Sequence, residues 1–103
     1  MTEYEIRFNY QKAMNQAAEL KGIASSLKKV GEFQLKECLG KISKSWTGTN
    51  SQDFVLKGNK MGVKIETSYQ NVTHTAEAVE TMAKNIYDAE MAALRVARER
   101  KNN

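Results

Sequence analysis

The sequence contains no proline and only six glycines in 103 residues. Proline removes a backbone donor and clashes with the preceding helical turn, so its absence permits very long helices. Five methionines and many alanine, lysine, glutamate and glutamine residues favour helix as well. A chain of this length is one domain at most. We therefore predict a single all-α domain spanning residues 1–103.

Cysteine and histidine are each present once, as Cys38 and His74. A single cysteine cannot form an internal disulfide, and the two residues together would leave a typical metal site two ligands short. We expect Cys38 to pack in the core as a small hydrophobic residue. We expect His74 to lie at the surface or at the edge of the packed stripe. No metal or cofactor is predicted.

The sequence also lacks the groupings that carry catalysis. No Ser or Cys is placed beside His74 by helical spacing as a nucleophile beside a base, and no glycine-rich phosphate loop occurs. We therefore predict that the protein is not an enzyme.

No apolar run approaches the roughly 18 residues of a membrane-spanning helix. The N-terminus has no basic segment followed by an apolar core, so no Sec-type signal peptide is predicted, and export by another route stays open. The net charge is +4, with lysine and glutamate interspersed. This mixture is typical of solvated helix surface rather than of a nucleic-acid interface, whose affinity would depend steeply on salt.

The first half of the chain has a helical stripe of apolar and small residues over residues 3–45. Its members are Ile6, Tyr10, Ala13, Ala17, Leu20, Ala24, Leu27, Gly31, Leu35, Cys38 and Ile42. An interior glycine costs about 1 kcal/mol of helix propensity. The surroundings of Gly31 are therefore the predicted place for a bend, for fraying, or for a break into two helices.

The second half has a heptad pattern over residues 52–98, in steps of four and three. Its members are Phe54, Gly58, Met61, Ile65, Ser68, Val72, Thr75, Val79, Met82, Ile86, Ala89, Ala93 and Val96. Ser68 and Thr75 weaken the middle because they bury little apolar area. A basic tail, residues 99–103, complements the dipole of the preceding helix.

Between the halves lies Ser45-Trp46-Thr47-Gly48-Thr49-Asn50-Ser51. Gly48 is suited to end the first helix, and Thr49, Asn50 or Ser51 to cap the second, which predicts a turn over residues 46–51. A turn this short makes the helices antiparallel neighbours in a hairpin. We predict that Trp46 packs near Phe54 or lies in a groove that another chain completes.

A two-helix hairpin has one buried seam and no enclosed core, and this chain carries apolar residues off that seam as well. We therefore expect a four-helix bundle, formed as a homodimer or with another helical protein. The residues predicted to bind a partner along the apolar seam are Phe54, Met61, Ile65, Val72, Val79, Met82 and Ile86.

With about 100 residues, two long helices and Trp46-Thr47-Gly48 at the mid-point, the chain resembles the WXG100 (ESAT-6-like) family. Members are small helical hairpins of type VII secretion in Gram-positive bacteria. The resemblance implies a non-enzymatic adaptor or secreted protein that is made in the cytoplasm and is exported, or escorts a larger effector. It also implies a helical partner, such as the N-terminal domain of an LXG toxin.

The family's export signal is a tyrosine followed four residues later by an acid. Here Tyr87 is followed by Glu90 at the third position, and Met91 occupies the fourth. The resemblance thus implies either a degenerate signal at Tyr87 and Glu90 or a signal carried by the partner. The alternative function is a general coiled-coil structural or regulatory protein unrelated to secretion.

Overall fold

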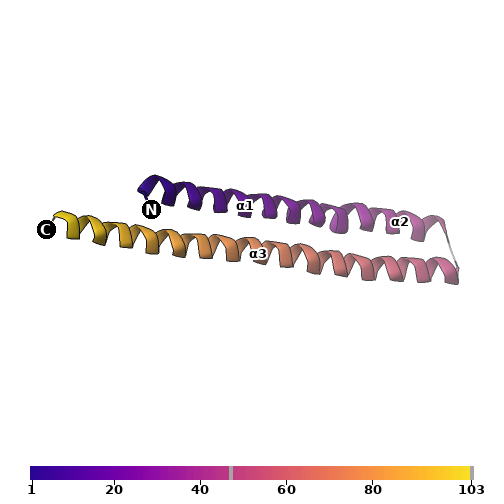
Figure 1. The fold of residues 1–103 in the computed structure, drawn as a ribbon. Coiled ribbons are helices and arrows are strands. Elements are labelled where there is room, and N and C mark those ends of the chain that lie inside the picture. Colours follow the sequence, from indigo (N-terminus) through magenta and orange to yellow (C-terminus); the bar gives the residue numbers. More distant parts are fainter. Residues whose placement is uncertain (47, 103) are drawn as a thin grey trace. The chain divides into compact units, whose positions relative to one another are not determined.

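The computed structural model describes residues 1–46 and 48–102. These residues form α1 (Glu3–Lys29), the π-helix η1 (Val30–Leu35), α2 (Lys36–Ser45) and α3 (Thr49–Asn102) (Figure 1). No strand occurs among the described residues, which confirms the all-α prediction. Thr47 of the predicted turn and Asn103 of the predicted tail lie outside them.

Two compact units make up the chain, and each is described by itself. The turn unit is Lys21–Thr73, and the terminal unit combines Met1–Leu20 with His74–Asn103. In the turn unit, the end of α1, η1 and α2 pack antiparallel to the start of α3, so the predicted helical hairpin is confirmed here. In the terminal unit, the start of α1 packs antiparallel to the end of α3, with Tyr10 against Tyr87.

Helix α1 begins where Thr2 supplies a cap. The backbone N–H of Glu5 donates to the Thr2 hydroxyl at 3.1 Å, and the N–H of Ile6 donates to the Thr2 carbonyl at 3.1 Å. Each bond satisfies a backbone donor that a helix start leaves unpaired. Glu3 and Glu5 add negative charge in the first turn, where it opposes the helix dipole.

The π-helix η1 occupies the segment in which the sequence predicted a bend or a break. The chain stays helical there, in a π-helical segment whose turn is wider than that of an α-helix. Beyond η1, Leu39 is buried and Cys38 is exposed. The prediction that Cys38 packs in the core is therefore wrong: between Leu35 and Ile42, the inward-facing position is that of Leu39, and helical spacing of three or four residues allows either neighbour.

Helix α3 is longer than residues 52–98 at both ends. It begins at Thr49 because the Gly48 carbonyl accepts the N–H of Gln52 at 3.1 Å. It continues to Asn102, so the described part of the predicted basic tail is helical, with Arg100 and Lys101 in the last turn. Positive charge stabilises that end of a helix.

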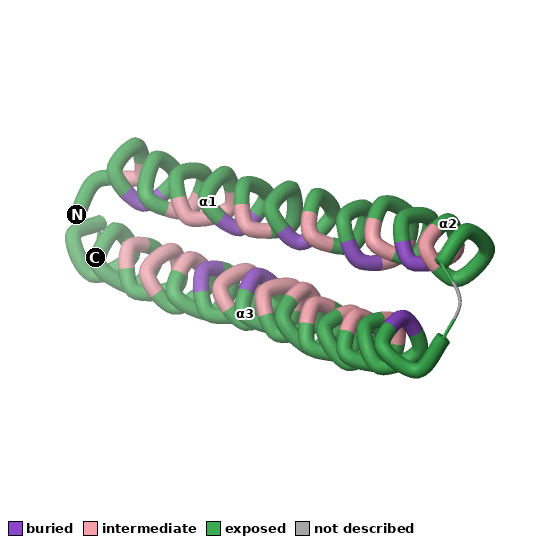
Figure 2. Tube along the Cα trace, turned by 90° about the vertical axis from the view of Figure 1, so that its right-hand side faces the viewer, coloured by how far each residue is buried: buried purple, intermediate pink, exposed green. Residues whose placement is uncertain are grey.

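Small residues dominate the core of both units, on the sides of the helices that face each other (Figure 2). Ala17, Ala76 and Ala83 are buried in the terminal unit, and Ala24, Gly31 and Leu39 in the turn unit. Small side chains allow two backbones to approach closely. Within the described residues, no helix has an apolar stretch that is long enough to cross a bilayer.

Candidate functional site: the turn and the outer apolar faces

The turn is built around Trp46 and Gly48. Trp46 leaves α2 in an extended conformation (φ −129°, ψ 112°), with its backbone N–H still bonded to the Ile42 carbonyl. Gly48 has φ +118°, which residues with a Cβ rarely adopt. The Ser51 hydroxyl donates to the Gly48 carbonyl at 2.8 Å. Gly48 itself thus precedes the first residue of α3, and Ser51 lies inside the helix instead of capping it.

The indole ring of Trp46 packs against Phe54, with ring centroids 6.2 Å apart and a 51° angle between the planes. This contact confirms the prediction that Trp46 covers the start of the second helix. The indole nevertheless stays 49% exposed. An aromatic pair of this kind stabilises the corner and still leaves an apolar surface at it.

A shallow groove of about 330 Å³ lies beside the turn. The residues that line it are Ser43, Trp46, Gly48, Ser51, Gln52, Val55, Leu56 and Asn59. The lining combines apolar side chains with hydroxyl and amide groups. The tryptophan therefore forms one wall of an open hollow at this end of the turn unit.

The structure separates the predicted seam residues of α3 into two groups. Ile65, Val72 and Val79 are half-buried on the side that faces the first half of the chain. The other four are exposed, with exposed fractions from 50% to 58%: Phe54, Met61, Met82 and Ile86. These four do not contribute a buried seam within the chain. That the residues bind a partner stays a prediction.

The positions that face inward on α3 form a second pattern with the same steps of four and three. In the turn unit they are Ser51, Val55, Gly58, Gly62, Ile65, Tyr69 and Val72. In the terminal unit they include Ala76, Val79, Ala83 and Tyr87. Seven of these eleven positions are absent from the predicted heptad pattern, which contains the bulkier Phe54, Met61 and Met82 in place of their neighbours Val55, Gly62 and Ala83. The regular spacing of the small residues could have revealed them.

Glycines provide the contact surface in the turn unit. Leu39 packs directly over Gly58, in the space where a Cβ would stand, and a Cβ on Gly31 would lie 2.8 Å from Ile65 Cγ2. The Tyr69 hydroxyl donates to Glu32 Oε1 at 3.0 Å. The pKa of the Tyr69 hydroxyl is raised mainly by its partial burial, and secondly by this hydrogen bond to Glu32.

The candidate export signal lies in a packed environment in the terminal unit. Tyr87 is half-buried, with its ring centroid 4.8 Å from that of Tyr10 and the Arg7 guanidinium 6.0 Å from its own ring. Glu90 is also half-buried, and so is Met91. The tyrosine ring is thus engaged by the start of α1. That Tyr87 and Glu90 act as a signal stays a prediction.

An ion-pair network joins the two helices of the terminal unit. Glu3 Oε1 pairs with Arg7 at 3.0 Å, and Glu3 Oε2 pairs with Arg98 at 3.2 Å. The hydrogen bonds from Arg7 and Arg98 lower the pKa of the Glu3 carboxyl below its ordinary value of 4.5. The same contact with Glu3 raises the pKa of Arg7. Both groups are solvated, so the network contributes modestly.

This network predicts a pH dependence of stability. A carboxyl whose folded pKa is lowered stabilises the fold above its unfolded pKa, and this contribution is lost as the pH falls through the folded pKa. Acidification from about pH 7 to about pH 3 should therefore lower the melting temperature of the native chain more than that of Glu3→Gln. Thermal melts followed by circular dichroism test this. Glu19→Gln, at an exposed position, is the control, and an acid response of Glu3→Gln as large as that of the native chain contradicts the expectation.

Among the described residues, no group of three or more His, Cys, Asp or Glu side chains gathers where it could hold a metal ion. His74 is exposed, as the sequence analysis expected. Comparison with known proteins finds no matching family model, no matching curated protein and no matching solved structure. The site is therefore defined by its own geometry: an aromatic turn and apolar outer faces on paired helices.

Proposed function

We propose that this chain is a non-enzymatic helical adaptor of the WXG100 type, which binds a helical partner protein and assists its export through a type VII secretion system. The observation that carries the proposal is the exposure of Phe54, Met61, Met82 and Ile86, each at least half exposed. Phe54 and Met61 lie in the turn unit, and Met82 and Ile86 in the terminal unit. Within each unit, exposed apolar residues at helical spacing are typical of a surface that another helix covers. Packing of a partner there would complete a four-helix bundle.

The position of the turn supports the same proposal. Trp46 and Gly48 lie between two antiparallel helical segments, as the resemblance implies, and the indole is half exposed beside an open groove. The engagement of Tyr87 by Tyr10 and Arg7 favours a signal carried by the partner. In this proposal, the chain acts in the cytoplasm before export and reaches the outside bound to the partner.

Export of the partner tests this function. In the native bacterium, deleting this reading frame should reduce secretion of the helical protein encoded beside it by at least about tenfold, because no adaptor is left to bind it. Expression of the native chain in trans should restore secretion. Unchanged secretion in the deletion strain would remove the export role and favour a coiled-coil protein unrelated to secretion.

A further inference from the structure

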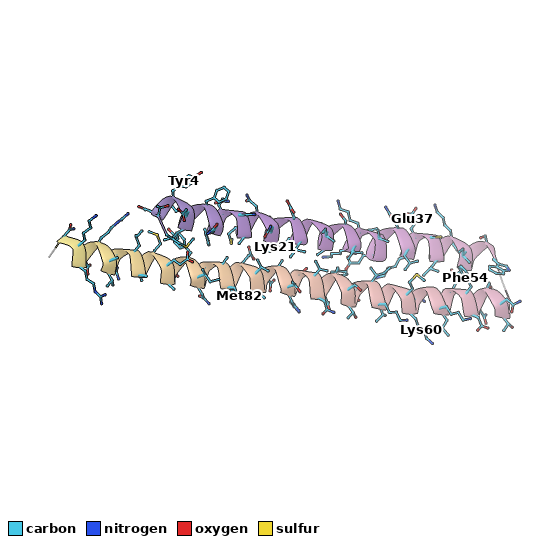
Figure 3. All side chains as sticks on the ribbon, viewed as in Figure 1. Tyr4, Lys21, Glu37, Phe54, Lys60 and Met82 are labelled. Carbon is cyan, nitrogen blue, oxygen red and sulfur yellow. The ribbon has the colours of Figure 1, made fainter. Side chains whose placement is uncertain are left out.

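Positive charge is concentrated in the turn unit. This unit contains nine lysines, no arginine and four acidic residues, whereas the terminal unit contains seven basic and eight acidic residues. All nine lysines are exposed, and Lys60 extends outward from α3 on the side away from α2 (Figure 3). The net positive charge of the chain therefore belongs to the turn unit, although the most obvious basic run is at the C-terminus.

The large exposed apolar residues of this unit include four that share one side of the hairpin. Each immediately precedes a residue that faces the opposite helical segment: Ile23 before Ala24, Val30 before Gly31, Phe54 before Val55, and Met61 before Gly62. One residue turns a helix by about 100°. Two antiparallel helices are related by an approximate two-fold axis that is normal to the plane of the two helix axes. This rotation exchanges the helices but not the two sides of the plane. A residue that immediately precedes an inward-facing residue therefore lies on the same side of the hairpin in both helices. Their exposed fractions are 54%, 42%, 50% and 56%.

The packing register orders these four residues along the hairpin. Leu39 packs on Gly58, and a Cβ on Gly62 would lie 3.6 Å from Leu35. Counting from these contacts places Phe54 nearest the turn, then Met61, and then Val30 and Ile23 on the other helical segment. We call this set the diagonal stripe. Measured along the hairpin axis, successive members are about seven residues, or about 10 Å, apart. This distance equals one heptad of an α-helix, so a single helix that crosses the hairpin could contact all four.

The same side of the hairpin is basic. Lys41, Lys57 and Lys64 also precede inward-facing residues, and no Asp or Glu of the turn unit occupies such a position. Lys41 pairs with Glu37 at 3.3 Å. Lys57 and Lys64 make no ion pair with a described residue. The diagonal stripe is thus an apolar line bordered by three ammonium groups, and two of them, those of Lys57 and Lys64, pair with no carboxylate among the described residues.

We propose that the diagonal stripe is the docking surface for an acidic amphipathic helix of a partner protein. The inference rests on the proposed adaptor function and specifies its partner. Carboxylates that flank the apolar residues of such a helix would meet Lys57 and Lys64, and opposite charges across an interface favour encounter and select the partner. A second copy of this chain would bring another Lys41, Lys57 and Lys64 to the same surface, so charge opposes self-association there.

Two synthetic helices test the proposal on the full chain. Each has about 28 residues, with leucine at the first and fourth position of every heptad, and the flanking positions carry glutamate in one and lysine in the other. By fluorescence anisotropy, the acidic helix should bind at least about tenfold more tightly than the basic helix, and added salt should weaken its binding.

Matched variants locate the surface. Val30→Ser with Met61→Ser should weaken binding of the acidic helix at least about tenfold. Phe33→Ser with Val63→Ser changes two apolar residues, one on each helical segment, that are more exposed than Val30 and Met61 but lie off the stripe. Its binding should stay within about twofold of the native chain. Circular dichroism on every variant separates lost binding from lost folding.

Other occupants of the stripe would contradict the proposal. Equal binding of the two helices, or equal loss in the two double variants, overturns it. A dimer of the native chain that Val30→Ser with Met61→Ser dissolves would assign the stripe to a second copy. Binding to vesicles of anionic lipid, but to neither helix, would assign it to a membrane surface.

If the co-encoded partner binds the native chain and the stripe variant equally, this inference fails and the adaptor function stands. If it binds neither, the adaptor function fails.

Discussion

Replacing Gly58 with alanine should lower the free energy of unfolding by about 1–3 kcal/mol, although alanine is the better helix former. The reason is the position of Leu39, which is 5% exposed and occupies the space that the new methyl group needs. The clash forces Leu39 outward or moves α2 away from α3. Urea unfolding followed by circular dichroism measures this loss directly.

Gly22→Ala is the matched control for this change. Nothing lies within 4 Å of a Cβ built on Gly22, and the residue is in an exposed part of α1. Its substitution should therefore raise the free energy of unfolding by about 0.5–1 kcal/mol, which is the gain in helix propensity alone. If the free energy of unfolding falls in Gly58→Ala and rises in Gly22→Ala, Gly58 is a position where the absence of a side chain is needed for packing. Stabilisation by both substitutions contradicts the described contact between α2 and α3.

In the terminal unit, Ala17→Leu should lower the melting temperature by several degrees, whereas Ala18→Leu should leave it nearly unchanged. Ala17 is fully buried, and its neighbour Ala18 is exposed. Overpacking a buried site costs about 1–3 kcal/mol, and about 1 kcal/mol shifts the melting temperature of a domain of this size by about 4–8 °C. Leucine and alanine are both good helix formers, so propensity does not obscure the comparison.

Thermal melts of the two leucine variants test the packing of this unit without adding charge. If Ala18→Leu is the more damaging change, the inward-facing register of α1 is wrong. If neither change has an effect, the start of α1 does not pack tightly against the end of α3.

Most of the helical architecture could be predicted from the sequence, because the signals are local. The absence of proline, the spacing of apolar residues and the glycine of the turn each act within a few residues. The contact of Trp46 with Phe54 could be predicted as well, since a short turn brings these two residues together. Helix ends were less predictable: α3 starts at Thr49, directly after Gly48, and no breaker stops the helix before Asn102.

The inward-facing register could not be predicted in full, because two stripes with the same spacing run along α3. One contains large side chains such as Phe54 and Met61, and the other contains small ones such as Gly62 and Ala83. A ranking by hydrophobicity selects the first stripe, whereas close helix packing buries the second. In the first half of the chain, Leu35 and Ile42 face inward as predicted, but the position between them that packs is Leu39, and Cys38 is exposed.

The same competition explains why the candidate site is difficult to recognise from the sequence. Each apolar position of a two-helix unit serves either the contact within the chain or a contact outside it, and hydrophobicity alone does not distinguish the two. Met61 and Met82 are exposed, whereas Ile65 and Val79 are half-buried. This difference depends on which side of α3 the opposite helical segment covers, so it can be recognised only from the packed structure.

The molar mass of the chain with and without a partner tests the central claim most directly. Size-exclusion chromatography with light scattering should be run on the purified chain, on the helical protein encoded beside it, and on their mixture. We predict a new species whose mass equals one copy of each chain or a simple multiple, with a higher melting temperature than either alone. A chain that stays monomeric and elutes separately from that partner at concentrations of tens of micromolar would contradict the proposed adaptor function.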